Sequence, residues 1–292
     1  MSNKYFQLGA SLYTPATNKN LLKELDGLKS ESKSMIVDTE DAVSEERLEE
    51  ALENLEAALK KTVDKSKIKK LRFIRPRNST VLKRILKMEG VEKIDGFVLP
   101  KCTIDSSIIY REILENCGMS FGVMPTIESI EMTKTSKIEQ LKSIFKSFEK
   151  TEIICIRIGG NDLFNELGLK RHPKVTIYET PLRIIIEKIV LGFKTSGFEI
   201  ASPVFDIIDD RITLQRELEY DMSYGFFAKT AIHPSQATII EQHIGEYAKQ
   251  NVSKAKGVIT ESNAVYIHDG QMMEKTCHIN WSQRIVSLSS NY

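Results

Sequence analysis

The chain has 292 residues, enough for one large domain such as an α/β barrel, which typically has about 250 residues. Its 41 Lys and Arg residues balance its 40 Asp and Glu residues, so the sequence lacks the excess of basic residues that a nucleic-acid-binding face needs. No apolar run approaches the roughly 20 residues of a membrane-spanning helix. We therefore expect a cytoplasmic protein with neither a nucleic-acid nor a membrane partner.

Short apolar runs recur along the chain, and most of them end at a polar or charged residue. They are Phe6–Tyr13, Ser34–Asp41, Leu71–Asn78, Gly96–Lys101, Ser120–Glu128, Ile153–Gly160, Glu199–Phe205 and Gly225–His233. Several, such as Ile153–Ile158, are almost continuously apolar rather than alternating. This pattern is typical of parallel strands that are covered on both faces.

A segment with helical composition follows each run. These segments are Asn18–Leu28, Ser44–Val63, Val81–Met88, Ser106–Cys117, Ser129–Phe148, Pro181–Thr195, Ile212–Tyr224 and Ser235–Ala248. In the second, apolar residues recur every three or four positions, and early glutamates and late lysines suit the helix dipole. The alternation predicts an α/β fold, a (β/α)8 TIM barrel over residues 1–250. Residues 251–292 remain as a C-terminal extension that we expect to pack on a neighbouring subunit.

Two carboxylates are expected side by side on the catalytic rim, where the barrel strands end. Glu128 ends the fifth run, and Asp162 lies just after the sixth. Adjacent carboxylates repel each other unless a proton or a cation lies between them. Oxygen ligands completed by water suit Mg²⁺. The sequence therefore predicts a magnesium site, with two unrelated salt bridges as the alternative.

Charged side chains also end the second and third runs. Arg75 and Arg77 flank a proline, and a guanidinium suits a carboxylate, a phosphate or a developing oxyanion. For either arginine, a structural bridge to an acid of the second run is the alternative. Asp38, Glu40 and Asp41 cannot all be buried unpaired. We predict that these acids hold Arg75 or the waters of a metal in place, while Asp41 could instead cap the next helix.

The turn after the sixth run is a candidate substrate-binding segment. Gly159 and Gly160 permit close approach of the backbone, so their amides could bind a substrate carboxylate, or they could simply form a tight turn. We also expect substrate contacts from Asn161 and from Lys101, at the end of the fourth run. Residues 161–180 form a long loop that is either a lid or collar over the site or an inert insertion.

The order of these motifs resembles that of the citrate lyase β-subunit-like proteins, within the wider group of HpcH–HpaI-type barrel C–C bond lyases that includes the malyl-CoA lyases. The similar pieces are LYTPA (Leu12–Ala16), DTEDAV (Asp38–Val43), FIRPRN (Phe73–Asn78), VLPK (Val98–Lys101), IES (Ile127–Ser129), GGNDL (Gly159–Leu163), GFFAKTAIHPSQ (Gly225–Gln236) and IHDGQMME (Ile267–Glu274). Relatives often carry Arg where Gly9, Ala10 and Ser11 stand here, and Asp where Glu274 stands. These departures indicate a divergent branch.

The resemblance implies Mg²⁺-dependent cleavage or formation of a C–C bond between an acyl thioester and a 2-keto acid, through an enolate. It places the metal on Glu128 and Asp162 and makes Arg75 the side chain that steadies the enolate oxygen. It also implies that Glu274, from the tail of a neighbouring subunit, is a proton donor or base. Relatives are commonly trimers or hexamers, so a homo-oligomer is expected.

We therefore predict a C–C bond lyase, or the reverse condensing enzyme, that acts on a small carboxylate or keto-acid-derived substrate, with use of a thioester left open. One alternative is an aldolase without CoA, or a thioester hydrolase, on the same metal site. Another is a catalytically inactive barrel that serves as a metabolite-binding subunit. A fold alone does not establish activity, so an enzymatic function must be inferred from the site residues. The presence of Glu128, Asp162 and Arg75 together favours an enzyme.

Overall fold

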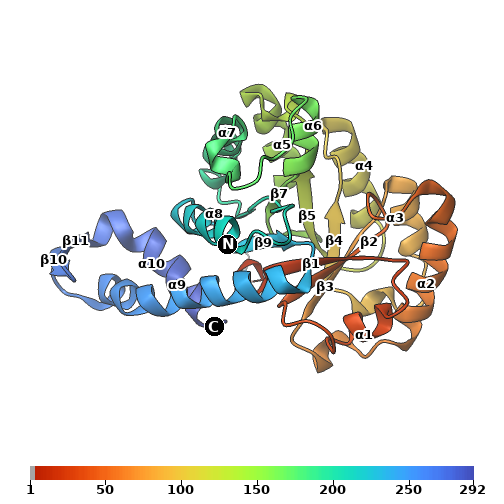
Figure 1. Cartoon of the computed structure of the whole chain (residues 1–292), viewed down its shortest axis with the longest axis horizontal. Helices are drawn as coiled ribbons and strands as arrows, with labels where there is room; N and C mark the ends of the chain where they lie inside the picture. The colour runs from red at the N-terminus through yellow and green to blue at the C-terminus, as the bar shows by residue number, and fades with distance from the viewer. Residues whose placement is uncertain (1–3) are drawn as a thin grey trace.

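Parallel strands form a closed barrel with helices outside it (Figure 1). The computed structural model describes residues 4–292. The barrel strands are β1 (Gly9–Pro15), β2 (Ser34–Asp38), β3 (Leu71–Arg75), β4 (Gly96–Leu99), β5 (Gly122–Ile127), β6 (Glu152–Ile153), β7 (Ile156–Ile158), β8 (Ile200–Ala201) and β9 (Ala228–Ala231). They are ordered β8-β7-β5-β4-β3-β2-β1-β9, and β6 pairs with β5 just ahead of β7. A parallel bridge between Ser202 and Lys229 closes the ring, which confirms the predicted TIM barrel.

Helices on the outside connect the strands. They are α1 (Leu21–Leu25), α2 (Leu48–Lys61), α3 (Ser79–Ile85), α4 (Ile104–Glu115), α5 (Thr135–Lys146), α6 (Gly160–Glu166), α7 (Leu182–Lys194), α8 (Arg211–Ser223), α9 (Pro234–Thr260) and α10 (Lys275–Ser289). Short 3-10 helices lie at Tyr5–Gln7, Glu45–Arg47, Lys65–Lys67, Val91–Lys93, Glu131–Thr133 and Ile177–Glu179. None of the helices in residues 4–292 is both long and apolar enough to cross a membrane.

Side chains fill most of the barrel interior. Every residue of β2, β3, β4 and β5 is buried, as expected for strands covered on both faces. One continuous buried cluster includes Phe73 and Met124 on the strands and Ile240 and Ile285 on α9 and α10. Open space for a ligand therefore lies at the rim of the barrel, where the strands end.

Several boundaries differ from the expected ones. The first helix is only Leu21–Leu25, and β8 is two residues long. The expected helix Ser129–Phe148 is a 3-10 turn followed by α5, because Lys134 between them is extended, with φ −66° and ψ 136°. The long loop after the sixth run begins with α6 rather than irregular chain.

The C-terminal extension packs mainly on its own barrel. Helix α9 continues without a break through residue 250, so the expected division at that residue falls inside a helix. The antiparallel hairpin β10 (Val265–His268) and β11 (Gln271–Glu274) lies at the outer end of α9, and α10 returns along α9 toward the barrel (Figure 1). There Arg284 bonds Glu199 at 2.7 Å. The hairpin and the outer ends of α9 and α10 extend beyond the barrel (Figure 1).

Candidate active site

A cavity of about 280 Å³ opens where the barrel strands end. Its walls come from β1, β2, β3, β5 and β7 and from the segments that follow β7, β8 and β9. At the roughly 30 Å³ that a water molecule occupies in the liquid, this volume would hold about nine waters. That is room for a small organic acid together with a hydrated ion.

The structure brings the two predicted metal carboxylates together. Glu128 and Asp162 both line this cavity, and both also line a neighbouring cavity of about 190 Å³. Burial, and then the charges of Asp162 and Glu40, raise the pKa of Glu128 to about 8. Burial also raises the pKa of Asp162. The surrounding protein therefore supplies too little positive charge to keep both carboxylates ionised.

This carboxylate pair fits a magnesium ion better than a metal held only by protein. Among residues 4–292, no group of three or more His, Cys, Asp or Glu side chains is arranged to hold a metal. An ion between Glu128 and Asp162 would take its remaining ligands from water and substrate. Mg²⁺ commonly binds in this way, through one or two carboxylates and several waters.

Two backbone features position Glu128. Lys101 adopts a positive φ of 48°, which is unusual for a residue with a side chain, and its amide donates to Glu128 Oε2 at 2.8 Å. A Cβ atom on Gly159 would lie 2.2 Å from Glu128 Cγ. The amide of Gly159 itself donates to the carbonyl of Ile127, so it is engaged within the barrel. Gly159 therefore provides space for the Glu128 side chain.

Replacing Gly159 with alanine should displace the Glu128 side chain and weaken magnesium binding. The physical reason is the 2.2 Å clash, which the glutamate can relieve only by moving. We expect the Mg²⁺ concentration that gives half of the maximal rise in melting temperature to increase by at least about tenfold, since disturbing the groups that orient a metal ligand typically costs about 10- to 100-fold in metal affinity. Gly257→Ala, on α9 and remote from the cavity, is the control. Equal magnesium titrations for both variants would contradict the prediction.

Arg75 is clamped by the acids of the β2 end. Asp38 accepts from its Nε and Nη2 atoms at 2.7 and 2.6 Å, and Glu40 and Asp41 lie 2.9 and 3.2 Å from Nη1. Its guanidinium carbon lies 5.1 Å from the centroid of the Tyr13 ring. Burial alone would lower the pKa of Arg75, but the bonds to Asp38 and the neighbouring carboxylates raise it. Arg75 is therefore a permanent, fixed cation on the cavity wall.

Arg77 and Lys101 do not line this cavity. Arg77 donates to the carbonyl of Val43 and pairs with Glu45 at 3.1 Å, so it holds the segment after β2 instead of facing a ligand. Lys101 Nζ bonds Glu40 at 2.7 Å, and this bond raises the pKa of the lysine to about 12. Lys101 lines the smaller, neighbouring cavity, where it remains half-exposed.

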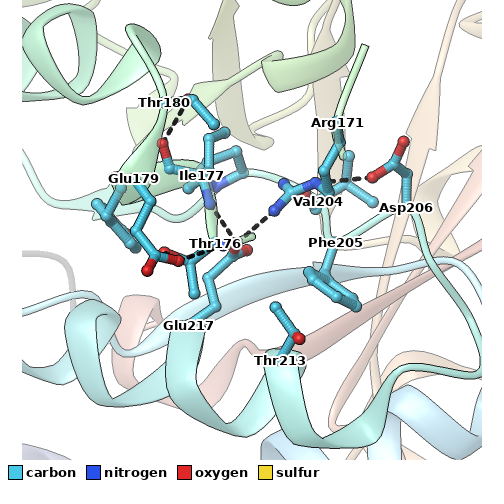
Figure 2. Close-up of polar contacts among 12 residues, drawn as sticks. Arg171, Thr176, Ile177, Glu179, Thr180, Val204, Phe205, Asp206, Thr213 and Glu217 are labelled. Atoms are coloured by element: carbon cyan, nitrogen blue, oxygen red, sulfur yellow. Dashed lines mark hydrogen bonds and ion pairs between the residues drawn. The ribbon is translucent and has the colours of Figure 1, made fainter. Parts of the chain in front are cut away.

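The loop after α6 is anchored by a buried arginine. Arg171 pairs with Glu217 at 2.5 Å and with Asp206 at 2.7 Å, and donates to the carbonyl of Val204 at 2.9 Å (Figure 2). The amide of Ile177 donates to the same Glu217 carboxylate at 2.8 Å. These bonds tie the loop to α8 and to the segment after β8. The loop is therefore a fixed collar of the barrel rim.

This collar shapes the wall next to the metal carboxylates. A Cβ atom on Gly160 would lie 3.1 Å from Pro203 and 3.2 Å from Ile177, so the collar packs directly against the start of α6. Gly160 and the exposed Asn161 both line the cavity. Gly159 lines it too, so all three predicted substrate ligands of this turn lie on the cavity wall.

The predicted tail residue Glu274 is not part of the cavity in this chain. It ends β11 on the outer hairpin, and its carboxylate accepts from Thr276 Oγ1 at 2.9 Å. The hairpin lies beyond the end of α9, away from the barrel strands (Figure 1). Only a neighbouring copy of the chain could bring this carboxylate to a site.

Sequence reasoning missed four polar residues that line the cavity, namely Tyr13, Thr126, Arg157 and Thr230. Tyr13 lies between two guanidiniums, those of Arg75 and Arg157, and Arg157 and Thr230 line the cavity with it. The signal for Arg157 was present, because it is a charge inside the otherwise apolar run Ile153–Ile158. The signal for Tyr13 was weaker, because an aromatic residue in a strand is usually part of the core.

A closed α/β barrel with a carboxylate pair and a clamped arginine at its rim defines a class of barrel enzymes with an acidic, metal-accepting site. The sequence places the chain more narrowly. It belongs to the family described as C–C bond lyase of the TIM-barrel fold, whose sequence model matches residues 2–292. Family membership and fold therefore agree with the resemblance that the motifs indicated.

Individual relatives are distant but cover nearly the whole chain. The chain is similar to (3S)-malyl-CoA thioesterase of Cereibacter sphaeroides, with 22% identity over 283 residues, 94% of this chain and 92% of that one. The CitE protein of Mycobacterium tuberculosis, solved with magnesium, acetoacetate and coenzyme A, superposes with a TM-score of 0.68 at 17% identity, covering 97% of this chain and 98% of that one. RipC from Yersinia pestis has a TM-score of 0.60 at 20% identity, with 82% and 95% covered. These structural likenesses show a shared fold.

The unfolding free energy of the metal-free protein should fall as the pH rises from about 4.5 to about 8. In this range the folded protein keeps the Glu128 proton, with a pKa of about 8, whereas the unfolded chain loses it near the ordinary value of 4.5. Because the folded state binds more protons there, raising the pH favours unfolding. Glu128→Gln cannot ionise and should show a flatter profile. Urea unfolding in EDTA at pH 5 and pH 8 tests this, and parallel profiles would contradict it.

Proposed function

We propose that this protein is a Mg²⁺-dependent lyase that cleaves, or in reverse forms, a C–C bond in a small carboxylate or keto-acid-derived substrate through an enolate. The observation that carries the proposal is the shared cavity of Glu128, Asp162 and Arg75 in a chain of the C–C bond lyase family. The magnesium-bound CitE structure, although distant in sequence, supports the choice of metal.

We assign Glu128 and Asp162 as the residues that hold the ion. Mg²⁺ bound there would supply positive charge that polarises a keto or hydroxyl oxygen of the substrate. Burial and neighbouring carboxylates raise the pKa values of both groups, and a bound cation would oppose this effect by favouring their ionised forms. Gly160 and Asn161 would contact the bound acid from the adjoining wall.

Arg75 would stabilise the enolate oxygen that forms when the bond breaks. Asp38 accepts from Nε and Nη2, Glu40 and Asp41 lie at ion-pair distance from Nη1, and one N–H of Nη2 is left for a ligand in the cavity that the guanidinium lines. A donor that is in place before charge develops is an effective way to lower a reaction barrier. We assign Asp38 and Glu40 as positioning residues, because both are buried and bind Arg75 directly.

Proton transfer needs a more exposed acid, and Asp41 is the candidate within this chain. Its side chain lines the cavity and is 53% exposed, whereas Asp38 lines the cavity but is buried and Glu40 is buried away from it. Glu274 of a neighbouring copy is the second candidate. The hairpin that carries it exposes Val265, Ile267 and Met272, which are apolar side chains suited to a subunit contact. We therefore also propose a homo-oligomer, a trimer or hexamer, in which this hairpin packs on the next subunit.

Mixing two inactive variants tests the shared site. If Glu274 acts across the interface, subunits of Asp162→Asn and Glu274→Gln should form mixed oligomers in which some sites carry both intact residues. Partial recovery of activity is the expected result. Activity that is no greater after mixing, in oligomers whose mixed composition is verified by native mass spectrometry, would assign proton transfer to the chain's own residues.

Thioester hydrolysis is the second candidate function, because the curated relative is a malyl-CoA thioesterase. A panel of 3-hydroxyacyl-CoA substrates separates the two reactions. A lyase releases a keto acid or aldehyde and leaves a shorter acyl-CoA, whereas a thioesterase releases free CoA and a hydroxy acid. Mass spectrometry of the products, with and without EDTA, distinguishes these outcomes. A catalytically inactive, metabolite-binding barrel would give neither product but would still show ligand-dependent melting.

A further inference from the structure

The floor of the cavity carries a guanidinium without a counter-charge. Arg157, on β7, is only 2% exposed and lines the cavity. Its donors reach Thr230 Oγ1 at 2.5 Å, Ser11 Oγ at 3.4 Å and Met124 Sδ at 3.6 Å, all of which are neutral groups. Within residues 4–292, no carboxylate lies at ion-pair distance from it. Arg75 and Arg171, the other buried guanidiniums near this rim, each pair with at least two carboxylates.

A buried cation in this setting is unfavourable by itself. Transfer of a charge out of water is costly unless a charged or hydrogen-bonding partner compensates it. Two hydroxyl groups, a thioether and the face of the Tyr13 ring, 5.7 Å from the guanidinium carbon, compensate the charge only in part, because none of them carries a net charge. Arg157 therefore lowers the stability of the empty fold and provides strong attraction for any anion that enters the cavity.

A second unsatisfied group lies directly beside it. Thr126 on β5 is the register partner of Arg157, and its hydroxyl is buried without a hydrogen-bond partner among the described residues. It also lines the cavity. Buried polar atoms are nearly always satisfied, so an unpaired hydroxyl on a residue that lines a cavity points to a partner supplied by a ligand. Thr126, as the register partner of Arg157, and Thr230, as its hydrogen-bond partner, therefore flank the guanidinium on the cavity wall.

The distance between these three residues and the predicted metal carboxylates limits the length of a ligand that can reach both. Thr126 precedes Glu128 by two residues, so both side chains face the barrel interior in successive layers. Two residues of parallel strand span about 6.6 Å. A molecule with acidic groups at both ends of a chain of four or five carbons can therefore bind near Glu128 with one end and near Arg157 with the other.

We propose that Arg157, Thr126 and Thr230 form a second anion subsite that binds the distal carboxylate of the small acid, so that the preferred acid is a 2-keto dicarboxylate. This inference deepens the proposed function and rests on it for the metal-bound end. The arginine presents paired donors that match the two oxygens of a carboxylate. A monocarboxylic keto acid would leave the buried charge of Arg157 uncompensated.

Binding measurements with matched acids test the subsite. The probes are oxaloacetate against 2-oxobutyrate and 2-oxoglutarate against 2-oxopentanoate, pairs that differ only by a terminal carboxylate or methyl group. In the presence of Mg²⁺, calorimetry should give at least tenfold tighter binding of the diacid in one of the two pairs, as expected for a charged hydrogen bond. Arg157→Gln should remove this preference, and should change the affinity for the monoacid less than threefold. Thr126→Val should reduce the preference in part.

Two further variants separate a binding role from a structural one. Arg72 is equally buried but donates to Thr62 outside the strands, away from the cavity, so Arg72→Gln should keep the diacid preference. Removing the uncompensated charge in Arg157→Gln should leave the melting temperature of the empty protein unchanged or higher. A lower melting temperature together with a retained diacid preference would mean that Arg157 is structural and would overturn the subsite.

The remaining outcomes distinguish the subsite from the function on which it rests. Magnesium-dependent binding of keto acids, with no diacid preference that depends on Arg157, overturns the subsite and leaves the proposed function in place. Binding of no keto acid with Mg²⁺ present, or binding that is equal in EDTA, overturns the metal-dependent function together with the subsite. A preference for inorganic phosphate over every diacid would overturn the carboxylate assignment.

Discussion

Replacement of Glu128 with glutamine is expected to abolish magnesium binding and to reduce turnover by about 1000-fold. The substitution removes one of two carboxylates from a site in which no third acidic or imidazole ligand is available among residues 4–292. Polarisation by a bound metal contributes several kcal/mol to a barrier, and each 1.36 kcal/mol corresponds to a factor of ten. The measurements are the Mg²⁺-induced rise in melting temperature and the rate of product formation.

The control for Glu128→Gln is Glu139→Gln on α5. Glu139 is exposed, and its one ion pair within residues 4–292 is with Lys142, one turn further along the same helix. This variant should keep the magnesium response and the activity of the wild type. Because glutamine has nearly the shape of glutamic acid, Glu128→Gln should also fold normally. A wild-type magnesium response in Glu128→Gln would show that the ion binds elsewhere.

Replacement of Lys229 with methionine is expected to lower the unfolding free energy by about 3–5 kcal/mol. Lys229 is fully enclosed between the barrel and α8, where its Nζ atom lies 3.0 Å from both Glu217 and Asp221 and donates to the carbonyl of Pro203 at 2.9 Å. Although burial by itself raises the pKa of Glu217, Lys229 and Arg171 hold it below its ordinary value. Without the lysine, Glu217 would keep Arg171 as a partner, whereas Asp221 would keep only the neutral hydroxyl groups of Tyr178 and Ser202. Urea unfolding measures the loss.

Two comparison variants define the cause of that loss. Arg47→Met removes an exposed pair with Glu50 and should change the unfolding free energy by less than about 1 kcal/mol. Adding Asp221→Asn to Lys229→Met removes the carboxylate that lost its partner, so the double variant should recover part of the stability. A double variant that is less stable than the lysine variant alone would contradict an electrostatic origin.

The repeat of strands and helices was readable from the sequence because each barrel strand is buried on both faces. Strands such as β2 and β3 are therefore apolar at nearly every position, and their ends are marked by charge. Exact lengths were not readable. The apolar run that contains β8 extends well beyond Ile200–Ala201, because apolar content reports burial and not where backbone pairing stops.

The position of a residue within its strand explains which site residues were predicted and which were missed. Three predicted residues stand at strand ends, namely Glu128, Asp162 and Arg75. The ends of all barrel strands meet at the same rim, so these residues could be predicted without knowing the direction of each side chain. Arg157 lies inside a strand, and so does Arg72, yet one faces the cavity and the other faces Thr62 outside the sheet. Because alternate residues of a strand point to opposite faces, only the pairing register tells them apart.

Whether residues 161–180 form a fixed collar or a mobile lid could not be predicted, because the partners of this loop lie far away in the sequence. Arg171 lies in a polar loop, and its partners Asp206 and Glu217 are 35 and 46 residues further along the chain. Nothing local to Arg171 marks it as buried. The distinction between an anchored collar and a mobile lid therefore became clear only when these segments were seen together (Figure 2).

The clamp on Arg75 has a consequence for how this barrel would manage developing charge. Three carboxylates and an aromatic face fix the guanidinium before any ligand is present, so its dipoles need not reorient during a bond-breaking event. Reorientation of solvent is the step that makes the same charge separation slow in water. The free-energy cost of orienting the Arg75 guanidinium is therefore met when the chain folds, and not in each catalytic cycle.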